Sequence, residues 1–504
     1  MNRAVALRRL RDTRETWDVL VIGGGATGLG TALDAAARGH RTALLEQSDF
    51  AQATSSRSTK LIHGGVRYLR QGHLPLVRES LRERGRLLAN APHLVHKLPF
   101  IVPAYQWSDR AFYGIGLKLY DALAGRLGLG ATQVLTRAET LAHAPTLATA
   151  GLRGGVLYWD AQFDDARLAI ALAQTLAARG GVAANYVRVE SLLKEHGRIA
   201  GVRARDVESG DEFELRARVV VNATGVFTDA IRRLDDTAAP RMIAASQGAH
   251  IVLPRAFLPG DTAVMVPKTA DGRVLFAIPW HDRVLVGTTD TPVTETPLEP
   301  RPLAAELEFL LAHAGEYLSA RPQASDILST WAGLRPLVSS GAGGATSKLS
   351  RDHALVVSPS GLVTITGGKW TTYRRMAEDA VDRAVQVGGL ALRPSVTHEL
   401  ALDDFTAAHR AALEQENAAL RAPLHPRLPY HLSDVVCAAR HEMARTVEDV
   451  LSRRTRALLL DARGSMEAAP TVAALLTKEL GRDASWEAQQ VAAFTALARG
   501  YMPS

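Results

Sequence analysis

Residues 17–30 read Trp-Asp-Val-Leu-Val-Ile-Gly-Gly-Gly-Ala-Thr-Gly-Leu-Gly, and this stretch determines the fold class that we predict. Its first six residues form an apolar run of the length of a buried strand. An alanine-rich helical pattern follows over about residues 27–38, closes at Gly39, and leads to a second strand pattern at 41–46. A strand, a glycine turn, a helix and a second strand in this order predict parallel strands in a doubly wound α/β sheet.

The glycine turn has the spacing of a dinucleotide-binding site. Gly23 permits the tight turn, Gly25 lets the backbone approach a pyrophosphate, and Gly28 lets the helix pack closely on the strand. The amino terminus of the helix then stabilises the phosphate charge. Glu46 ends the second strand at the distance expected of a residue that accepts hydrogen bonds from ribose hydroxyls. We therefore predict a Rossmann-type domain whose first cofactor-binding residues are Gly23, Gly25, Ala26, Thr27, Gly28 and Glu46.

The glycine motif does not distinguish FAD from NAD, but two later loops favour FAD. A Ser/Thr-rich stretch at 53–60 follows the second strand and offers many hydroxyl and amide donors to an extended cofactor. A second glycine pair precedes a helical pattern at 370–385, whose amino terminus would stabilise negative charge on a reduced flavin. The further residues predicted to bind FAD are Thr54, Ser55, Ser58, Lys60, Leu61, His63, Gly64, Gly225, Gly367, Gly368 and Lys369.

A chain of 504 residues exceeds what one hydrophobic core usually organises, so we expect several domains. Strand patterns at 219–225 and 362–368 also end in glycine turns, which indicates a nucleotide-binding domain assembled from separated segments. The predicted division is a basic extension at 1–16, an FAD-binding domain at 17–90, 151–240 and 330–393, a substrate-covering cap at 91–150 and 241–329, and a helical domain at 394–504.

Cysteine usage and charge limit the location and the partners that we expect. The single cysteine, Cys437, cannot form an internal disulfide, and no Cys/His cluster with metal-ligand spacing accompanies it, so we predict no structural metal and a reducing, cytoplasmic-side location. No apolar run is long enough to be a signal peptide or to span a bilayer. The net charge of +7 favours anionic partners. Nucleic acid ranks last among these, because no RNA- or DNA-binding motif is present.

Several motifs beyond the glycine turn closely resemble the aerobic FAD-dependent glycerol-3-phosphate dehydrogenases, which are glycine/D-amino-acid oxidase-like flavoproteins. These motifs lie at 58–69, 331–337, 350–353 and 366–374. The likeness covers about residues 17–379 and continues more faintly through the terminal helices. One departure is Trp370, where the family would have an aliphatic residue; we expect this difference to affect packing only.

The resemblance implies a fold and an activity. The fold would comprise an FAD domain, an antiparallel-sheet cap and a C-terminal all-α domain. The reaction would be oxidation of sn-glycerol 3-phosphate to dihydroxyacetone phosphate, with electrons passed to ubiquinone or menaquinone. It also implies peripheral association with the inner face of the cell membrane, since family members lie on the cytoplasmic face of bacterial membranes or in mitochondria, and it leaves open whether the chain forms a homodimer. The basic net charge is compatible with an anionic membrane surface.

The matched motifs place candidate catalytic and substrate-binding residues beside the flavin. His63 is the first candidate for the base that removes the hydroxyl proton, since its ordinary pKa of about 6.5 suits that role near neutral pH. Arg335 would stabilise the developing alkoxide. The substrate phosphate carries close to two negative charges and requires converging cations. The predicted substrate-binding residues are Arg67, Tyr68, Arg335, Arg351 and Lys369.

The electron acceptor stays less well defined than the substrate. The chain has no Cys cluster or haem-attachment motif, so the acceptor must itself reach the flavin. The aromatic and aliphatic segment at 111–120 is flanked by basic residues, and it suits either a membrane-interface segment or cap-domain core. Three alternatives remain: a glycerol-3-phosphate oxidase that uses oxygen and produces peroxide, an amine or amino-acid oxidase of the same fold, and a non-catalytic flavoprotein.

Overall fold

Strand β1 (Thr16–Ile22) lies at the centre of the parallel part of a mixed sheet, as its apolar sequence predicts. It pairs in parallel with β2 (Thr42–Leu45) on one side and with β10 (Glu212–Asn222) on the other. The same sheet contains β7 (Val182–Ala184), β8 (Val187–Glu195), β9 (Arg198–Asp206), β17 (His353–Val357) and β18 (Val363–Gly367). In it β7 is parallel to β2 and β18 is parallel to β10, whereas β8, β9 and β17 add antiparallel pairs. The predicted doubly wound α/β sheet is confirmed, and the glycine turn lies at the carboxyl end of β1.

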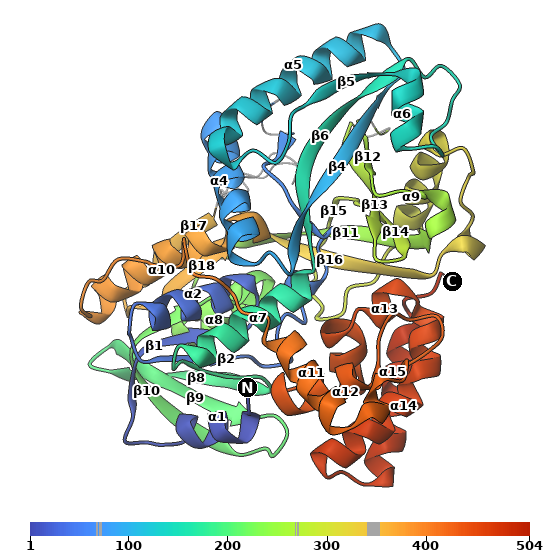
Figure 1. Cartoon of the computed structure of the whole chain (residues 1–504). Helices are drawn as coiled ribbons and strands as arrows, with labels where there is room; N and C mark the ends of the chain where they lie inside the picture. The colour runs from blue at the N-terminus through green and yellow to red at the C-terminus, as the bar shows by residue number, and fades with distance from the viewer. Residues whose placement is uncertain (67–68, 70–72, 268, 270–271, 340–352, 504) are drawn as a thin grey trace.

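The helix that follows the glycine turn is the central helix of this domain. Helix α2 (Ala26–Ala37) is buried along most of its length between α7 (Asp165–Ala178) and α10 (Tyr373–Gly388) (Figure 1). Gly30 permits the close approach of α10, because a Cβ atom at this position would lie 2.8 Å from the Tyr373 ring. The contact fixes α10, and the glycine loop before it, against the nucleotide-binding unit.

A second sheet forms the cap. Its path runs through β15 (Thr291–Pro292), β11 (Ile243–Pro254), β14 (Arg283–Gly287), β13 (Leu275–Trp280), β12 (Ala263–Val266), β4 (Val95–Ala104), β6 (Gly154–Phe163) and β3 (Leu61–Ile62), with β16 (Ser329–Val338) beside β11 and β5 (Gln133–Thr136) beside β6. All of these pairs are antiparallel except that of β12 with β4. The helices of this region are α4 (Leu74–Asn90), α5 (Trp107–Ala124), α6 (Arg137–His143) and α9 (Ala304–Tyr317).

The chain crosses between the two sheets at points that the sequence does not reveal. The segments predicted for the FAD-binding domain include β6 and β16, yet both strands hydrogen-bond within the cap sheet, β6 with β4 and β16 with β11. Apolar periodicity identifies a strand, but it does not identify the strand with which it pairs. The predicted domain limits therefore stay a prediction, and the two sheets share a boundary along which the cavity described below is found.

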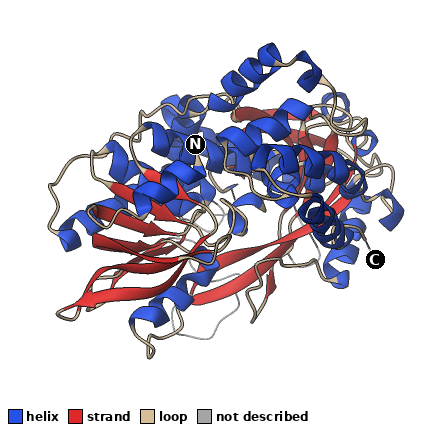
Figure 2. Ribbon diagram, turned by 90° about the horizontal axis from the view of Figure 1, so that it is seen from below, coloured by secondary structure: helices blue, strands red, loops and turns tan. Residues whose placement is uncertain are grey.

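The terminal segment is helical, as predicted. Its helices are α11 (Phe405–Glu416), α12 (Leu432–His441), α13 (Ala457–Leu460), α14 (Ala462–Leu480) and α15 (Ala484–Arg499). Buried Arg453 and Arg454 both bond to Asp49, which follows β2, and thereby join this domain to the nucleotide-binding unit. Figure 2 shows most of the helices, in blue, on one side of the strands.

The amino-terminal extension is attached to the nucleotide-binding unit by charged groups. In helix α1 (Arg3–Leu10), Arg3 donates to Asp206 at 2.7 Å and to the Asn185 carbonyl at 3.1 Å.

The structure describes residues 1–66, 69, 73–267, 269, 272–339 and 353–503 as a computed structural model. Within these ranges, no helix combines the length and the apolar character needed to cross a bilayer.

Candidate active site

The glycine turn and the start of α2 form a cradle for a pyrophosphate. Gly23 has a φ angle of +112°, and a Cβ atom there would lie 2.7 Å from the Ala223 carbonyl oxygen. A Cβ atom on Gly28 would lie 1.9 Å from the Gly23 oxygen, so only glycine lets the helix begin this close to the turn. The Ala26 N–H donates to Ser55 Oγ at 2.9 Å, which brings the Ser/Thr-rich loop to the helix amino terminus. Backbone amides at such a terminus bind phosphate groups.

Glu46 lies at the end of β2, where an adenosine ribose would be held. Its carboxylate accepts hydrogen bonds from the Gly24 N–H at 2.6 Å and the Ser48 N–H at 2.8 Å. Burial raises the pKa of Glu46, and these backbone donors oppose that shift. Together with the glycine cradle, this acceptor next to the turn fits the nucleotide half of FAD.

A cavity of about 980 Å³ lies along the boundary of the two sheets and leads away from the cradle. Its volume is that of a typical small-molecule site. The predicted residues that line it are Thr54, Ser58, Leu61, His63, Arg335, Gly368 and Lys369. The predicted FAD loops, the candidate base and two candidate phosphate-binding cations thus meet around one space.

Asp165, at the start of α7, holds the Ser/Thr-rich loop from behind. The Ser58 N–H and hydroxyl both donate to Asp165, at 3.0 and 2.7 Å. Lys60 Nζ donates to Asp165 at 2.7 Å and to the Ser56 carbonyl at 2.8 Å, and Arg456 donates to both of these acceptors. The ammonium group of Lys60 is therefore buried behind the loop and does not line the cavity.

Burial and neighbouring charges shift the pKa values of Lys60 and Asp165 in this cluster. Burial lowers the pKa of Lys60 to about 7, with Arg456 adding to the shift and Asp165 opposing it. Although burial favours protonated Asp165, Lys60 and Arg456 hold the pKa of Asp165 below its ordinary value. Ser58, predicted as a cofactor ligand, donates its hydroxyl hydrogen to Asp165, and its oxygen accepts from the Lys60 N–H at 3.0 Å.

The loop after β18 contacts the same loop from the opposite side. The Trp370 indole N–H donates to the Ser55 carbonyl at 2.9 Å, and Trp370 also lines the cavity, so this residue does more than fill the core. Gly367 and Gly368 both have positive φ angles, and a Cβ atom on Gly368 would lie 2.3 Å from Met376 Sδ. The Gly225 carbonyl accepts from Thr366 Oγ1 at 3.3 Å, which places the ends of β10 and β18 together.

Arg335 lies on β16 and is oriented by the backbone of the cap. Its guanidinium donates to the Gln247 and Thr289 carbonyls at 3.3 and 2.9 Å, and it lies 3.4 Å from an Asp290 carboxylate oxygen. Lys369 also lines the cavity, and its Nζ lies 3.4 Å from the Oγ atom of buried Ser80. The predicted substrate ligands Arg67, Tyr68 and Arg351 lie outside the described residues.

His250 is a cavity residue that sequence reasoning missed. It lies on β11, is 2% exposed, and stacks on Trp331 with ring centroids 5.2 Å apart. Its Nε2 atom is 3.0 Å from Thr59 Oγ1. Burial, with Lys60 and Arg335 nearby, lowers the pKa of His250 well below its ordinary value, so the ring is neutral near pH 7. The pairing of β11 with β14 and β16 positions this histidine beside the cavity, and a single strand pattern does not predict that pairing.

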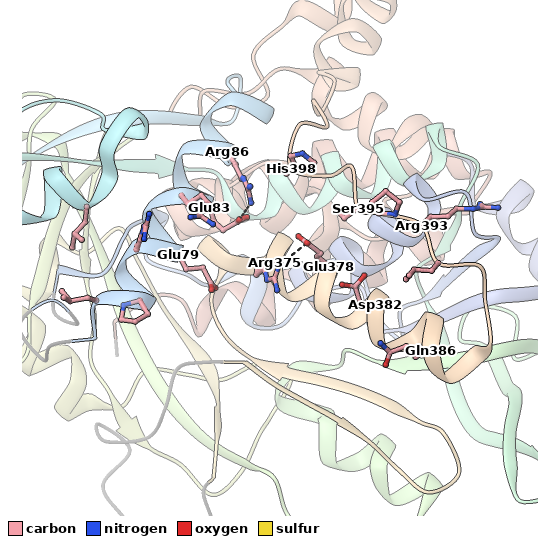
Figure 3. A pocket seen from close by; sticks show the side chains of 17 residues that line it. Glu79, Glu83, Arg86, Arg375, Glu378, Asp382, Gln386, Arg393, Ser395 and His398 are labelled. Atoms are coloured by element: carbon pink, nitrogen blue, oxygen red, sulfur yellow. Dashed lines mark hydrogen bonds and ion pairs between the residues drawn. The ribbon is translucent and has the colours of Figure 1, made fainter.

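A second hollow lies away from this chemistry. It has a volume of about 1250 Å³ and lies between α4, α10 and the segment at 392–398 (Figure 3). Some of its charged lining residues pair with one another, as in the ion pairs of Arg375 with Glu378 and of Arg86 with Glu83. None of the predicted site residues that the structure describes lines it. We therefore assign the chemistry to the smaller cavity.

The fold and the cradle define the class of protein: a flavin-dependent oxidoreductase with an added helical domain. Residues 18–374 match the family model described as FAD dependent oxidoreductase, and residues 363–489 match the C-terminal domain of alpha-glycerophosphate oxidase. Mitochondrial glycerol-3-phosphate dehydrogenases are similar over almost the whole chain. The protein from Macaca fascicularis is 40% identical over 96% of this chain and 73% of its own, and that from Arabidopsis thaliana is 40% identical over 94% and 84%.

A solved structure agrees with these matches. The glycerol-3-phosphate dehydrogenase from Bacillus halodurans, complexed with FAD, superimposes with a TM-score of 0.81 at 28% identity, covering 99% of this chain and 98% of that one. The chain belongs to the family of FAD-dependent glycerol-3-phosphate dehydrogenases, and FAD is its cofactor.

Proposed function

We propose that the chain oxidises sn-glycerol 3-phosphate to dihydroxyacetone phosphate and passes the electrons to a membrane quinone. The observation that carries this proposal is the convergence of His63, Arg335 and Lys369 on one cavity beside the FAD loops. The two cations suit a phosphate, and the histidine suits a substrate hydroxyl. The dehydrogenases that share 40% identity with this chain support the choice of substrate.

Each residue has a distinct task in this proposal. FAD, when bound, would supply the acceptor for the hydride of carbon 2 of the substrate. His63 takes the proton from the hydroxyl oxygen, so that the carbon–oxygen bond becomes a carbonyl. Arg335 and Lys369 hold the phosphate, with Arg335 already oriented by the Gln247 and Thr289 carbonyls before substrate arrives.

The exposed side chains of helix α5 favour an apolar electron acceptor that arrives from a membrane. Phe112, Ile115 and Leu119 are 56%, 73% and 47% exposed, and all three also line the cavity. The helix lies along the outer edge of the cap (Figure 1). Arg110 and Lys118 flank this apolar row, and such a mixture of apolar and basic side chains suits an anionic bilayer surface. An apolar quinone would then enter the cavity directly from the bilayer.

Replacing Phe112 and Ile115 together with serine is expected to weaken binding to anionic vesicles by about tenfold or more, because two side chains that enter the interface are lost. Co-sedimentation with vesicles that contain phosphatidylglycerol measures this. The control is Leu392→Ser, which removes a 78% exposed leucine beside the second hollow and should leave binding unchanged. Equal binding of the double variant and the wild type would remove α5 from the membrane contact.

The acceptor itself is tested by comparing two products. With glycerol 3-phosphate as the donor, we expect rapid reduction of a short-chain ubiquinone analogue and little hydrogen peroxide in air. The apolar cavity mouth at α5 favours quinone over an oxygen-only reaction. Peroxide formed in step with substrate oxidation, without quinone reduction, would instead support the glycerol-3-phosphate oxidase alternative.

A further inference from the structure

The peptide group that joins His63 to Gly64 is held at both ends. The Gly64 N–H donates to Tyr120 Oη at 2.7 Å, and the His63 carbonyl accepts from Thr371 Oγ1 at 3.4 Å. Because a peptide unit is planar, bonds to its N–H and its C=O together restrict its rotation. Rotation of this peptide unit changes the ψ torsion of His63. The two bonds therefore help to determine where the His63 side chain lies in the cavity.

Tyr120 is itself fixed by a buried charged pair. Its hydroxyl donates to the Asp160 carboxylate, with oxygens 3.0 and 3.1 Å away, and Asp160 accepts from Arg84 Nη1 at 2.6 Å. All three residues are at most 2% exposed. Burial and the nearby Asp160 raise the pKa of Tyr120 well above its ordinary value, so the phenol keeps its proton and donates to Asp160. Its oxygen is then left to accept from Gly64.

The approach of Tyr120 to the backbone depends on glycine. A Cβ atom on Gly64 would lie 2.5 Å from Tyr120 Oη and 2.5 Å from Leu81 Cδ2. Strand β3 brings this corner to β6, since Ile62 pairs with Ala161, one residue from Asp160. The hydrogen-bonded row of Arg84, Asp160 and Tyr120 therefore ends on the backbone next to the candidate base.

We propose that Tyr120 is a positioning residue for His63: its hydroxyl fixes the peptide after His63 so that the imidazole meets the substrate hydroxyl. The inference rests on the proposed function, because it assumes that His63 is the base. Tyr120 lies on the inner side of α5, whose exposed apolar row lines the cavity mouth. A helix proposed to contact the membrane is thus hydrogen-bonded directly to the backbone beside the base.

The test is Tyr120→Phe in the FAD-loaded enzyme, a change that removes one oxygen atom from the core. We expect the limiting rate of anaerobic flavin reduction by glycerol 3-phosphate to fall about tenfold or more, because small misplacements of a catalytic group are costly. Apparent substrate affinity and FAD content should stay near wild type. Hydrogen exchange of the Gly64 amide should become faster. The control is Tyr105→Phe, which removes a half-buried hydroxyl that donates to the Ala148 carbonyl at 3.2 Å.

A double-mutant cycle with His63→Ala shows whether Tyr120 acts through His63. If it does, Tyr120→Phe has little further effect on the limiting rate once His63 is gone. Additive losses, or a wild-type limiting rate in Tyr120→Phe, would overturn the inference while the wild-type enzyme still reduces its flavin. Failure of the wild-type flavin to be reduced by glycerol 3-phosphate would instead overturn the proposed function, and the inference with it.

Discussion

Replacing His63 with alanine is expected to slow the reduction of flavin by glycerol 3-phosphate by about 10²-fold or more, while FAD stays bound. The side chain lines the cavity beside the FAD loops, whereas the cradle for the pyrophosphate is built from other residues, so the loss should fall on proton transfer. Anaerobic stopped-flow absorbance measures the rate, and the absorbance of the purified variant reports its FAD content.

The matched control is His425→Ala, which removes a histidine paired with Glu467 on the surface of the helical domain. It should reduce its flavin at close to the wild-type rate. Near-normal reduction in His63→Ala would assign the base elsewhere. His250 would then become the candidate, since it lines the same cavity and is neutral near pH 7.

Arg335→Ala should weaken the binding of glycerol 3-phosphate by about 10²-fold, because each charge-assisted hydrogen bond contributes roughly 1.5–3 kcal/mol and the guanidinium can supply two. The dependence of the flavin reduction rate on substrate concentration gives the affinity. Arg335→Lys should be intermediate, since it keeps the charge but loses the planar fork.

Two comparisons separate this effect from a loss of structure. Arg335 also lies 3.4 Å from the buried carboxylate of Asp290, so FAD content and thermal unfolding should be measured in parallel. Arg375→Ala removes another ion-paired arginine, 42% exposed beside the second hollow, and should leave substrate affinity unchanged. An unaltered affinity in a well-folded Arg335→Ala protein would contradict the placement of the phosphate.

Local sequence predicts the nucleotide half of the molecule well. The apolar run of β1, the glycine turn and α2 form a continuous unit whose residues interact with near neighbours in the chain. Gly23 and Gly28 follow from backbone sterics alone, and the structure shows the close contacts that exclude a side chain at both positions. Short-range periodicity and turn chemistry are sufficient for such a unit.

The cavity is less predictable because it depends on contacts between distant segments. His250 reaches it through the pairing of β11 with β16, and Asp160 reaches it through the pairing of β6 with β3 and β4. Lys60 belongs to a recognisable loop, but the direction of its side chain is set by its bond to Asp165, which comes from a remote helix. Residue type and spacing along one segment do not carry such information.

The most direct measurement is anaerobic mixing of the purified, FAD-loaded protein with sn-glycerol 3-phosphate, followed at the absorbance of oxidised flavin. The proposed function predicts rapid bleaching that saturates with substrate concentration and yields one dihydroxyacetone phosphate per flavin, while glycerol without the phosphate bleaches far more slowly. Flavin that stays oxidised in excess glycerol 3-phosphate would contradict it.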